Sequence, residues 1–326
     1  MRQRNLGPLQ TSAIGLGCMG LSQGYGPTDD EQSVRVLGRA LDLGVTMLDT
    51  AMSYGRGHNE RLLAGVLRTR RGDAVVATKF GIVRDEHGVR VDARPERVRD
   101  YCEASLARLG VDEIDLYYLH RADPDVPISE TVGAMADLVH AGKVRHLGLS
   151  EVTAEQLHQA AQVHPIAAVQ LEWSLLWREP EADIVPAARA HDIGLVPYSP
   201  LGRGLLTATL TTAADVETSD FRTGDPRFQG DGLIANQRQV AALRRVADDL
   251  GVTAAQLALA WLLAQGADVV PIPGTRDVDR ITENARSAEL QLSSTDLQQL
   301  DELVPRSGWA GDRRGFAVPV IARRGE

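Results

Sequence analysis

Short apolar runs recur along the chain and are separated by segments long enough to form helices. Runs of this length and composition are typical of strands buried on both faces. Eight of them follow a short N-terminal hairpin, at residues 13–16, 45–48, 74–77, 114–119, 144–149, 166–169, 193–197 and 269–272. The pattern therefore predicts a parallel sheet of eight strands.

The intervening segments carry the start and stop signals of helices. Thr28 opens a Thr-Asp-Asp-Glu capping-box pattern, and Gly44 ends the same segment. Pro95 and Gly110 bracket another helix, and Thr153 opens a second capping box directly after an apolar run. Strands and helices therefore alternate along the chain.

Such alternation, repeated eight times with right-handed crossovers, favours closure into a (β/α)8 TIM barrel. An open doubly wound sheet is the alternative, and Gly15-Leu16-Gly17-Cys18-Met19-Gly20 has its G-x-G-x-x-G spacing. That fold also needs an acidic residue closing a second strand, whereas residues 28–43 are predicted to be a helix. We therefore predict the barrel, with residues 1–326 as a single domain.

Two segments interrupt the alternation. Residues 207–237 are rich in Asp, Thr and Gly and are predicted to form a long loop after the seventh strand. The tail after Pro305 has weak periodicity but contains Trp309. Both segments are candidates for covering the mouth of the barrel.

Composition narrows the function classes. The formal net charge of -9 disfavours general binding to nucleic acid. Only Cys18 and Cys102 are present, too few for a disulfide framework and without the spacing of a zinc site, so no metal is predicted. The first residues lack the apolar stretch typical of a secretion signal, so we expect none, and no apolar run is long enough to span a membrane. We expect a cytoplasmic protein.

Four reactive side chains follow consecutive predicted strands. Asp49 follows the second strand, Lys79 the third and His120 the fourth, and Tyr54 lies shortly beyond Asp49 in the same connection. In barrel enzymes the carboxyl ends of the strands together form the active site. The sequence therefore predicts that these four side chains meet.

Their chemistry suits a proton donor and the groups that tune it. A free tyrosine titrates near ~10, so Tyr54 needs a neighbouring cation to exchange a proton near neutrality, and Lys79 supplies that charge. Asp49 would pair with Lys79, and His120 would donate to a carbonyl oxygen or to Tyr54.

Ordered motifs across the chain resemble the aldo-keto reductase family. Gly44-Val45-Thr46-Met47-Leu48-Asp49-Thr50-Ala51, followed by Tyr54 and Asn59-Glu60, is similar to its signature. Further matching segments are Gly15 to Gly20, Thr78-Lys79, Asp115 to His120, Gly148-Leu149-Ser150, Tyr198 to Gly204 and Ile272 to Thr275. The resemblance implies a barrel that reduces aldehydes or ketones with NADPH, with Asp49, Tyr54, Lys79 and His120 as catalytic tetrad.

The same resemblance implies a cofactor site at the carboxyl ends of the strands. Ser150 and Gln170 would hold the nicotinamide amide, Trp173 would stack under the ring, and Glu151 stands where many relatives have asparagine. The full predicted set is Gly17, Cys18, Met19, Asp49, Ser150, Glu151, Gln170, Trp173, Tyr198, Ser199, Pro200, Leu201, Gly202, Arg203, Gly204, Ile272, Pro273, Gly274, Thr275, Arg276, Arg280, Glu283 and Asn284.

Two arginines bear on the choice of cofactor. Arg276 and Arg280 follow Gly274-Thr275 at the start of a predicted helix, where guanidinium groups and helix-start amides suit a phosphate monoester. This favours NADPH over NADH, with Arg276 as the stronger candidate. By resemblance, Glu283 and Asn284 would contact the adenine.

The resemblance implies a small carbonyl compound as substrate. Tyr25, Met52, Phe80 and Trp309 are candidates for the substrate pocket. Two other functions are compatible with the fold: a cofactor-sensing protein like the potassium-channel β subunits, and a barrel lyase in which Lys79 forms a Schiff base. The pattern predicts no oligomeric state.

Overall fold

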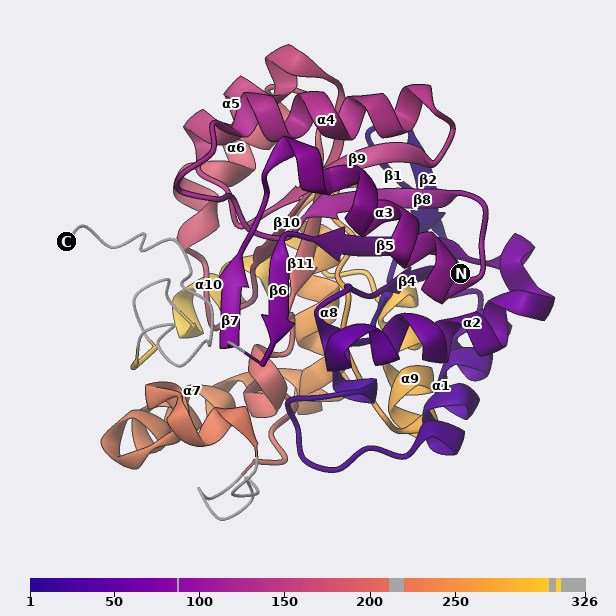
Figure 1. Cartoon of the computed structure of the whole chain (residues 1–326). Helices are drawn as coiled ribbons and strands as arrows, with labels where there is room; N and C mark the ends of the chain where they lie inside the picture. The colour runs from indigo at the N-terminus through magenta and orange to yellow at the C-terminus, as the bar shows by residue number, and fades with distance from the viewer. Residues whose placement is uncertain (87, 211–219, 305–308, 312–326) are drawn as a thin grey trace.

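A parallel sheet forms the centre of the protein, and helices surround it (Figure 1). The computed structural model describes residues 1–86, 88–210, 220–304 and 309–311. Seven strands pair in the order β11-β10-β9-β8-β5-β4-β3. Their bounds are β3 Leu16–Gly17, β4 Met47–Asp49, β5 Val75–Phe80, β8 Ile114–Leu119, β9 Val144–Ser150, β10 Ile166–Glu172 and β11 Gly194–Tyr198.

Residues 268–273 take the place of the eighth strand and close the barrel. On one side the amides of Val270 and Ile272 donate to the carbonyls of Leu195 and Pro197 in β11. On the other side, Gly15 and Gly17 donate to the carbonyls of Pro271 and Pro273. The prolines lack N–H groups, so this segment cannot form a regular ladder with β3. The predicted TIM barrel is confirmed.

Ten helices are described, most of them connecting one strand to the next. Their bounds are α1 Asp30–Asp42, α2 His58–Arg70, α3 Pro95–Leu109, α4 Ile128–His140, α5 Ala154–Val163, α6 Ile184–Arg189, α7 Gly230–Asp249, α8 Ala254–Ala264, α9 Val278–Arg286 and α10 Ser294–Leu303. Thr153 caps α5 with a capping box, as predicted. Asp29, rather than Thr28, caps α1, because its carboxylate accepts from the Gln32 amide.

Two hairpins lie outside the barrel sheet. The predicted N-terminal hairpin, β1 (Gln3–Leu6) and β2 (Leu9–Ser12), packs against the starts of β10 and β11, and Leu6 is fully buried against Gly194. A second hairpin, β6 (Ile82–Asp85) and β7 (Gly88–Val91), follows β5 and was not predicted. It places Ile82 and Arg84 beside the carboxyl ends of the strands.

The two segments that interrupt the alternation differ from the prediction. Residues 207–237 are not one loop, because two short 3-10 helices at Phe221–Gly224 and Pro226–Phe228 precede α7, which begins at Gly230. Of the tail, only 309–311 are described; there Trp309 is buried and Ala310 donates to Asn236. The prediction that the rest of the tail covers the barrel mouth lies outside the described residues.

Membrane crossing was tested on the described helices. None is long and apolar enough to cross a bilayer alone; α7 and α8 reach that length only when counted together across an 87° bend.

Candidate active site

A cavity of about 800 Å³ opens at the carboxyl ends of the barrel strands. Asp49 ends β4, His120 follows β8, Ser150 ends β9 and Gln170 lies in β10, and all four line the cavity. Tyr54 begins a short 3-10 helix after β4 and lines it as well. The parallel strands therefore bring together residues that are far apart in the sequence.

Lys79 and Asp49 form a buried ion pair beneath this cavity. The Lys79 ammonium donates to the Asp49 carboxylate and, over 2.8 Å, to the Thr50 carbonyl. The other Asp49 oxygen accepts from Gln170 Nε2 at 2.7 Å. Burial lowers the pKa of Lys79, but Asp49 and Tyr54 outweigh it, so the pKa is raised and Lys79 stays charged near neutrality.

Tyr54 and His120 face each other above that pair. Their ring centroids are 5.8 Å apart with the planes nearly perpendicular, and Lys79 Nζ lies 5.2 Å from the Tyr54 ring centroid. Burial raises the pKa of Tyr54, and Lys79 only partly offsets it. Lys79 was predicted to bring the pKa of Tyr54 toward neutrality. Its charge does lower this pKa, but the increase caused by desolvation is larger.

His120 is neutral at physiological pH. Burial, Arg121 and Lys79 hold its pKa well below the ordinary value, and its Nδ1 is buried without a hydrogen-bond partner among the described residues. A neutral imidazole has one N–H, so it can donate one hydrogen bond to a substrate oxygen.

Most of the predicted cofactor residues line the same cavity. They are Gly17, Met19, Asp49, Ser150, Gln170, Tyr198, Ser199, Pro200, Leu201, Arg203, Gly204, Ile272, Pro273, Gly274, Thr275, Arg276, Arg280, Glu283 and Asn284. The cavity thus extends from Tyr54 to the first turns of α9. The presence of Arg276 and Arg280 at its α9 end fits a dinucleotide that carries an additional phosphate.

Trp173 does not reach this cavity, contrary to the prediction. Its side chain is 1% exposed, donates to Glu181 over 3.1 Å and packs edge-on against Trp261. Tyr198, at the end of β11, lines the cavity instead and is half-buried. Tyr198 is therefore the described aromatic ring in position to lie against a nicotinamide.

Glu151 supports Tyr198 from behind. Its carboxylate accepts from the Tyr198 hydroxyl at 3.1 Å and from the Glu172 amide at 3.0 Å. The residue is buried and has a φ of 53°, a conformation that asparagine adopts more readily than glutamate. Glu151 is outside the cavity lining and contacts Tyr198, which is part of it.

Several other predicted residues lie outside the cavity lining, namely Lys79, Cys18, Gly202, Met52, Phe80 and Trp309. Lys79 lies beneath it, as described. Phe80 is fully buried and stacks on Tyr117 with centroids 5.1 Å apart. Of the four substrate-pocket candidates, Tyr25 alone lines the cavity.

The two arginines near α9 are not equivalent. Arg276 donates to the carbonyl oxygens of Tyr25 and Pro27, which ties the loop before α1 to the start of α9. Arg280 is exposed, lines the cavity and makes no side-chain hydrogen bond or ion pair within the described part of the chain. Arg280 is therefore the guanidinium available for a phosphate, a change from the preference for Arg276.

A bridge of side chains crosses the cavity from the segment before α7. The Phe221 amide donates to the Gly24 carbonyl at 3.0 Å, and the Phe221 ring meets the Tyr25 ring edge-on at 4.8 Å. The Arg222 guanidinium lies over the Tyr25 ring, 5.2 Å from its centroid. Tyr25, Phe221 and Arg222 all line the cavity, so the described part of this segment contributes to its wall.

Two arginines near Tyr54 were not predicted from the sequence to belong to the site. Arg121 follows His120 directly, and Arg84 lies in β6; both line the cavity. Arg121 could have been found from its position after a strand end. Arg84 could not, because nothing in the sequence predicts the β6–β7 hairpin.

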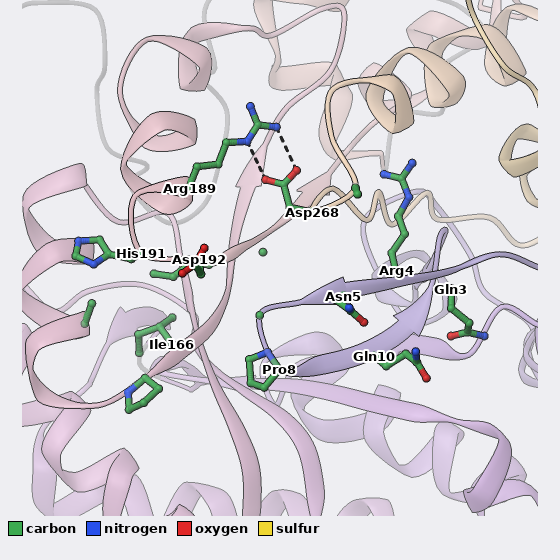
Figure 2. A pocket seen from close by; sticks show the side chains of 16 residues that line it. Gln3, Arg4, Asn5, Pro8, Gln10, Ile166, Arg189, His191, Asp192 and Asp268 are labelled. Carbon is green, nitrogen blue, oxygen red and sulfur yellow. Dashed lines mark hydrogen bonds and ion pairs between the residues drawn. The ribbon is translucent and has the colours of Figure 1, made fainter.

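A second cavity, of about 840 Å³, lies at the opposite end of the barrel (Figure 2). Three of its charged side chains have partners: Arg4 donates to three carbonyl oxygens, and Arg189 pairs with Asp268. No group of three or more His, Cys, Asp or Glu side chains that could hold a metal ion occurs in the described ranges.

Comparison with known proteins identifies the family. The aldo/keto reductase family model matches residues 13–305, and the chain belongs to this family. It is 42% identical over 93% of its length to a probable aldo-keto reductase 1 of Glycine max, covering 88% of that protein. It is 39% identical over 95% of its length to the aldo-keto reductase yakc [NADP(+)] of Schizosaccharomyces pombe, covering 93% of that protein.

Solved structures agree with this placement. A glycerol dehydrogenase of Gluconobacter oxydans superimposes with a TM-score of 0.86 and 30% identity, over 95% of this chain and 97% of that one. An aldo-keto reductase of Klebsiella pneumoniae in complex with NADPH gives a TM-score of 0.74 and 27% identity, over 98% and 100%.

Proposed function

We propose that this protein reduces the carbonyl group of a small aldehyde or ketone with NADPH, with Tyr54 as the proton donor. The observation that carries the proposal is the meeting of Tyr54 and His120 in one cavity above the buried pair of Lys79 and Asp49. Family membership, the NADP(+) in the name of the yeast relative and the NADPH bound by the Klebsiella protein support the cofactor.

NADPH supplies the hydride when bound. Ser150, Gln170, Tyr198 and Arg280 all line the cavity. In this proposal Ser150 and Gln170 would hold the carboxamide, Tyr198 would lie against the ring, and Arg280 would contact the ribose phosphate. Gln170 is itself held by Asp49, so the ion pair and the amide-binding side chain form one connected unit.

Tyr54 then protonates the carbonyl oxygen. Its raised pKa keeps the phenol protonated at neutral pH, and the alkoxide formed by hydride addition is a much stronger base, so transfer to it is favourable. His120 donates its one N–H to the same oxygen, and the Lys79 charge stabilises the phenolate that remains.

The two alternative functions are less well supported. A Schiff-base lysine must lose its proton, whereas Asp49 holds Lys79 in its charged form. A purely cofactor-sensing protein would have no need of the assembled Tyr54 and His120 pair.

The test is oxidation of NADPH, followed at 340 nm, against a panel of aldehydes and ketones for the wild type and Tyr54→Phe. The variant keeps the ring but loses the transferable proton, so kcat should fall by about 10²-fold or more while NADPH affinity changes little. Turnover by Tyr54→Phe at the wild-type rate would refute the role of the tyrosine.

A further inference from the structure

Arg121 presents a guanidinium edge to the cavity beside His120. Its Nη1 donates to the His120 carbonyl at 2.6 Å and to Ser150 Oγ at 3.3 Å, which fixes one side of the group. The side chain is 8% exposed, and its Nε is buried without a hydrogen-bond partner. No carboxylate pairs with Arg121 anywhere in the part of the chain that the structure describes.

Arg84 contributes a second guanidinium from the β6–β7 hairpin. It lines the same cavity, and its Nε is likewise buried without a partner. Burial lowers its pKa, and both arginines act to lower the pKa of His120, which places both charges near that imidazole. No ion pair of Arg84 is present among the described residues.

The balance of charge around the reacting groups is therefore positive. Asp49 neutralises Lys79, but Arg84 and Arg121 have no acidic counterpart near His120. Three further acidic residues in the lining are Asp29, which caps α1, Asp277, which caps α9, and Glu283, which accepts from Thr253. Because desolvated guanidinium groups are costly unless paired, this arrangement suits an anionic ligand.

We propose that the carbonyl substrate carries a carboxylate a few bonds from its carbonyl carbon, and that Arg121 and Arg84 bind this carboxylate. This rests on the proposed reductase function. The planar guanidinium of Arg121, which lines the cavity and is held only through Nη1, suits the two oxygens of a carboxylate, and Arg84 adds a second charge. Since Arg121 follows His120 directly, the carbonyl and carboxylate sites are adjacent.

The experiment compares substrates that differ only in this charge. Steady-state kinetics with NADPH would be measured for succinic semialdehyde against its methyl ester, and for 4-carboxybenzaldehyde against methyl 4-formylbenzoate. The ester keeps the length of the acid but withdraws electrons more strongly than the ionised carboxylate. Its aldehyde is therefore intrinsically the more reactive of the pair, so a preference for the acid reports recognition of the charge. A third member, 4-formylphenyl phosphate, distinguishes a phosphate from a carboxylate.

The expected result is a preference in kcat/KM of tenfold or more for the acid over the ester in at least one pair. Arg121→Gln and Arg84→Gln should each reduce this acid-to-ester ratio by about tenfold. Arg121→Lys keeps the charge but loses the planar edge, so it should restore only part of the ratio. Arg90→Gln is the matched control, because Arg90 lies on the same hairpin, pairs with Asp85 and is outside the cavity lining.

The ratio separates binding of the carboxylate from general damage. If Arg121 only positioned Ser150, its loss would lower acid and ester turnover equally and leave the ratio unchanged, which would overturn the proposal. Equal wild-type kcat/KM for acid and ester, or a ratio that survives in both arginine variants, would also overturn it. A phosphate preferred over both acids would overturn the carboxylate assignment.

A binding measurement keeps this proposal distinct from the proposed function. Calorimetric titration of the NADP⁺-loaded enzyme with 4-(hydroxymethyl)benzoate and with its methyl ester reports the carboxylate site without turnover. Tighter binding of the acid that is lost in Arg121→Gln supports the site even if no aldehyde is reduced. Ester turnover without any acid preference would leave the reductase function intact and refute this inference.

Discussion

Removing Asp49 while keeping Lys79 is expected to destabilise the protein more than removing both. The two side chains are 3% and 0% exposed. In Asp49→Asn, the new amide can still accept from Gln170, and Lys79 keeps its bond to the Thr50 carbonyl, but the ammonium loses its counter-charge. An unpaired buried charge costs about 3–5 kcal/mol, and the retained bonds favour the lower figure.

In Asp49→Asn/Lys79→Met the buried charge is gone as well. The double variant should therefore be at least about 1 kcal/mol more stable than Asp49→Asn. Adding whatever Lys79→Met costs on its own gives the coupling energy, which is about 0.5–3 kcal/mol for residues in contact. For a chain of 326 residues the unfolding entropy is roughly 0.7 kcal/mol per degree, so a loss of about 3 kcal/mol lowers Tm by about 4 °C.

The pH dependence of folding stability should differ between the wild type and Asp49→Asn. In the wild type the pKa of Lys79 is raised, so its stabilising contribution is complete below about pH 10.4 and is lost above that value. In Asp49→Asn, burial acts without Asp49, and the pKa of Lys79 should fall below its usual value. The unfolded chain then binds more protons than the folded one, so the deficit of this variant should shrink between about pH 8 and 10.

Guanidinium unfolding followed by tryptophan fluorescence, for the four members of the cycle at pH 7 and pH 9.5, measures both effects. Strict additivity of the single variants within about 0.5 kcal/mol would show that the two charges are not coupled in the folded protein. A pH-independent deficit in Asp49→Asn would show that Lys79 does not carry the unpaired charge.

Three further predictions concern cofactor binding and stability. Arg280→Ala should weaken NADPH binding by roughly tenfold and leave NADH binding nearly unchanged, and equal losses of affinity for the two cofactors would contradict the phosphate contact. Arg276→Ala should weaken the binding of both cofactors, because it frees the loop before α1. Burial holds the pKa of His120 well below its usual value, so folded stability should fall by about 1.4 kcal/mol per pH unit below pH ~6.5, and His120→Gln should lose that slope in unfolding midpoints measured from pH 7 to 5.5. Trp173→Phe should lower stability by about 1–3 kcal/mol and leave NADPH affinity within twofold, while Tyr198→Leu should weaken NADPH binding; the opposite ranking in fluorescence titrations would return Trp173 to the cofactor site.

The sequence predicted the barrel well because its strands are buried on both faces. Residues 114–119 are strand β8 at the predicted bounds, and each of the first seven runs overlaps a strand. The eighth run, 269–272, lies in the right place but forms only an isolated bridge, because two prolines interrupt its ladder. The β6–β7 hairpin was missed, since apart from the buried Ile82 its residues are partly or fully exposed and form no apolar face to detect.

The candidate site was predictable where a strand end fixed the position of a side chain. Asp49, His120, Ser150 and Gln170 all reach the cavity for this reason. Trp173 lies beyond the end of β10, and there only tertiary packing decides whether a side chain faces the cavity or the core.

Hydrogen-bond partners that come from distant loops could not be predicted from the sequence either. The carbonyls of Tyr25 and Pro27 that engage Arg276 come from a connection whose path the local pattern does not encode. The choice between Arg276 and Arg280 therefore needed the structure.

The proline-containing segment completes the barrel beside Gly15 and Gly17, and this seam has only half the backbone hydrogen bonds of a regular ladder. Pro271 and Pro273 accept hydrogen bonds from Gly15 and Gly17 but have none to return, so first and last strands are joined in one direction only. We expect the backbone amides at this seam to exchange their hydrogens faster than those of the other barrel strands. Gly17 and Gly274 flank this seam and line the cavity, so a dinucleotide lying across both would fasten it. Cofactor binding would then act as the final closing step of the fold, adding stability in proportion to ligand concentration.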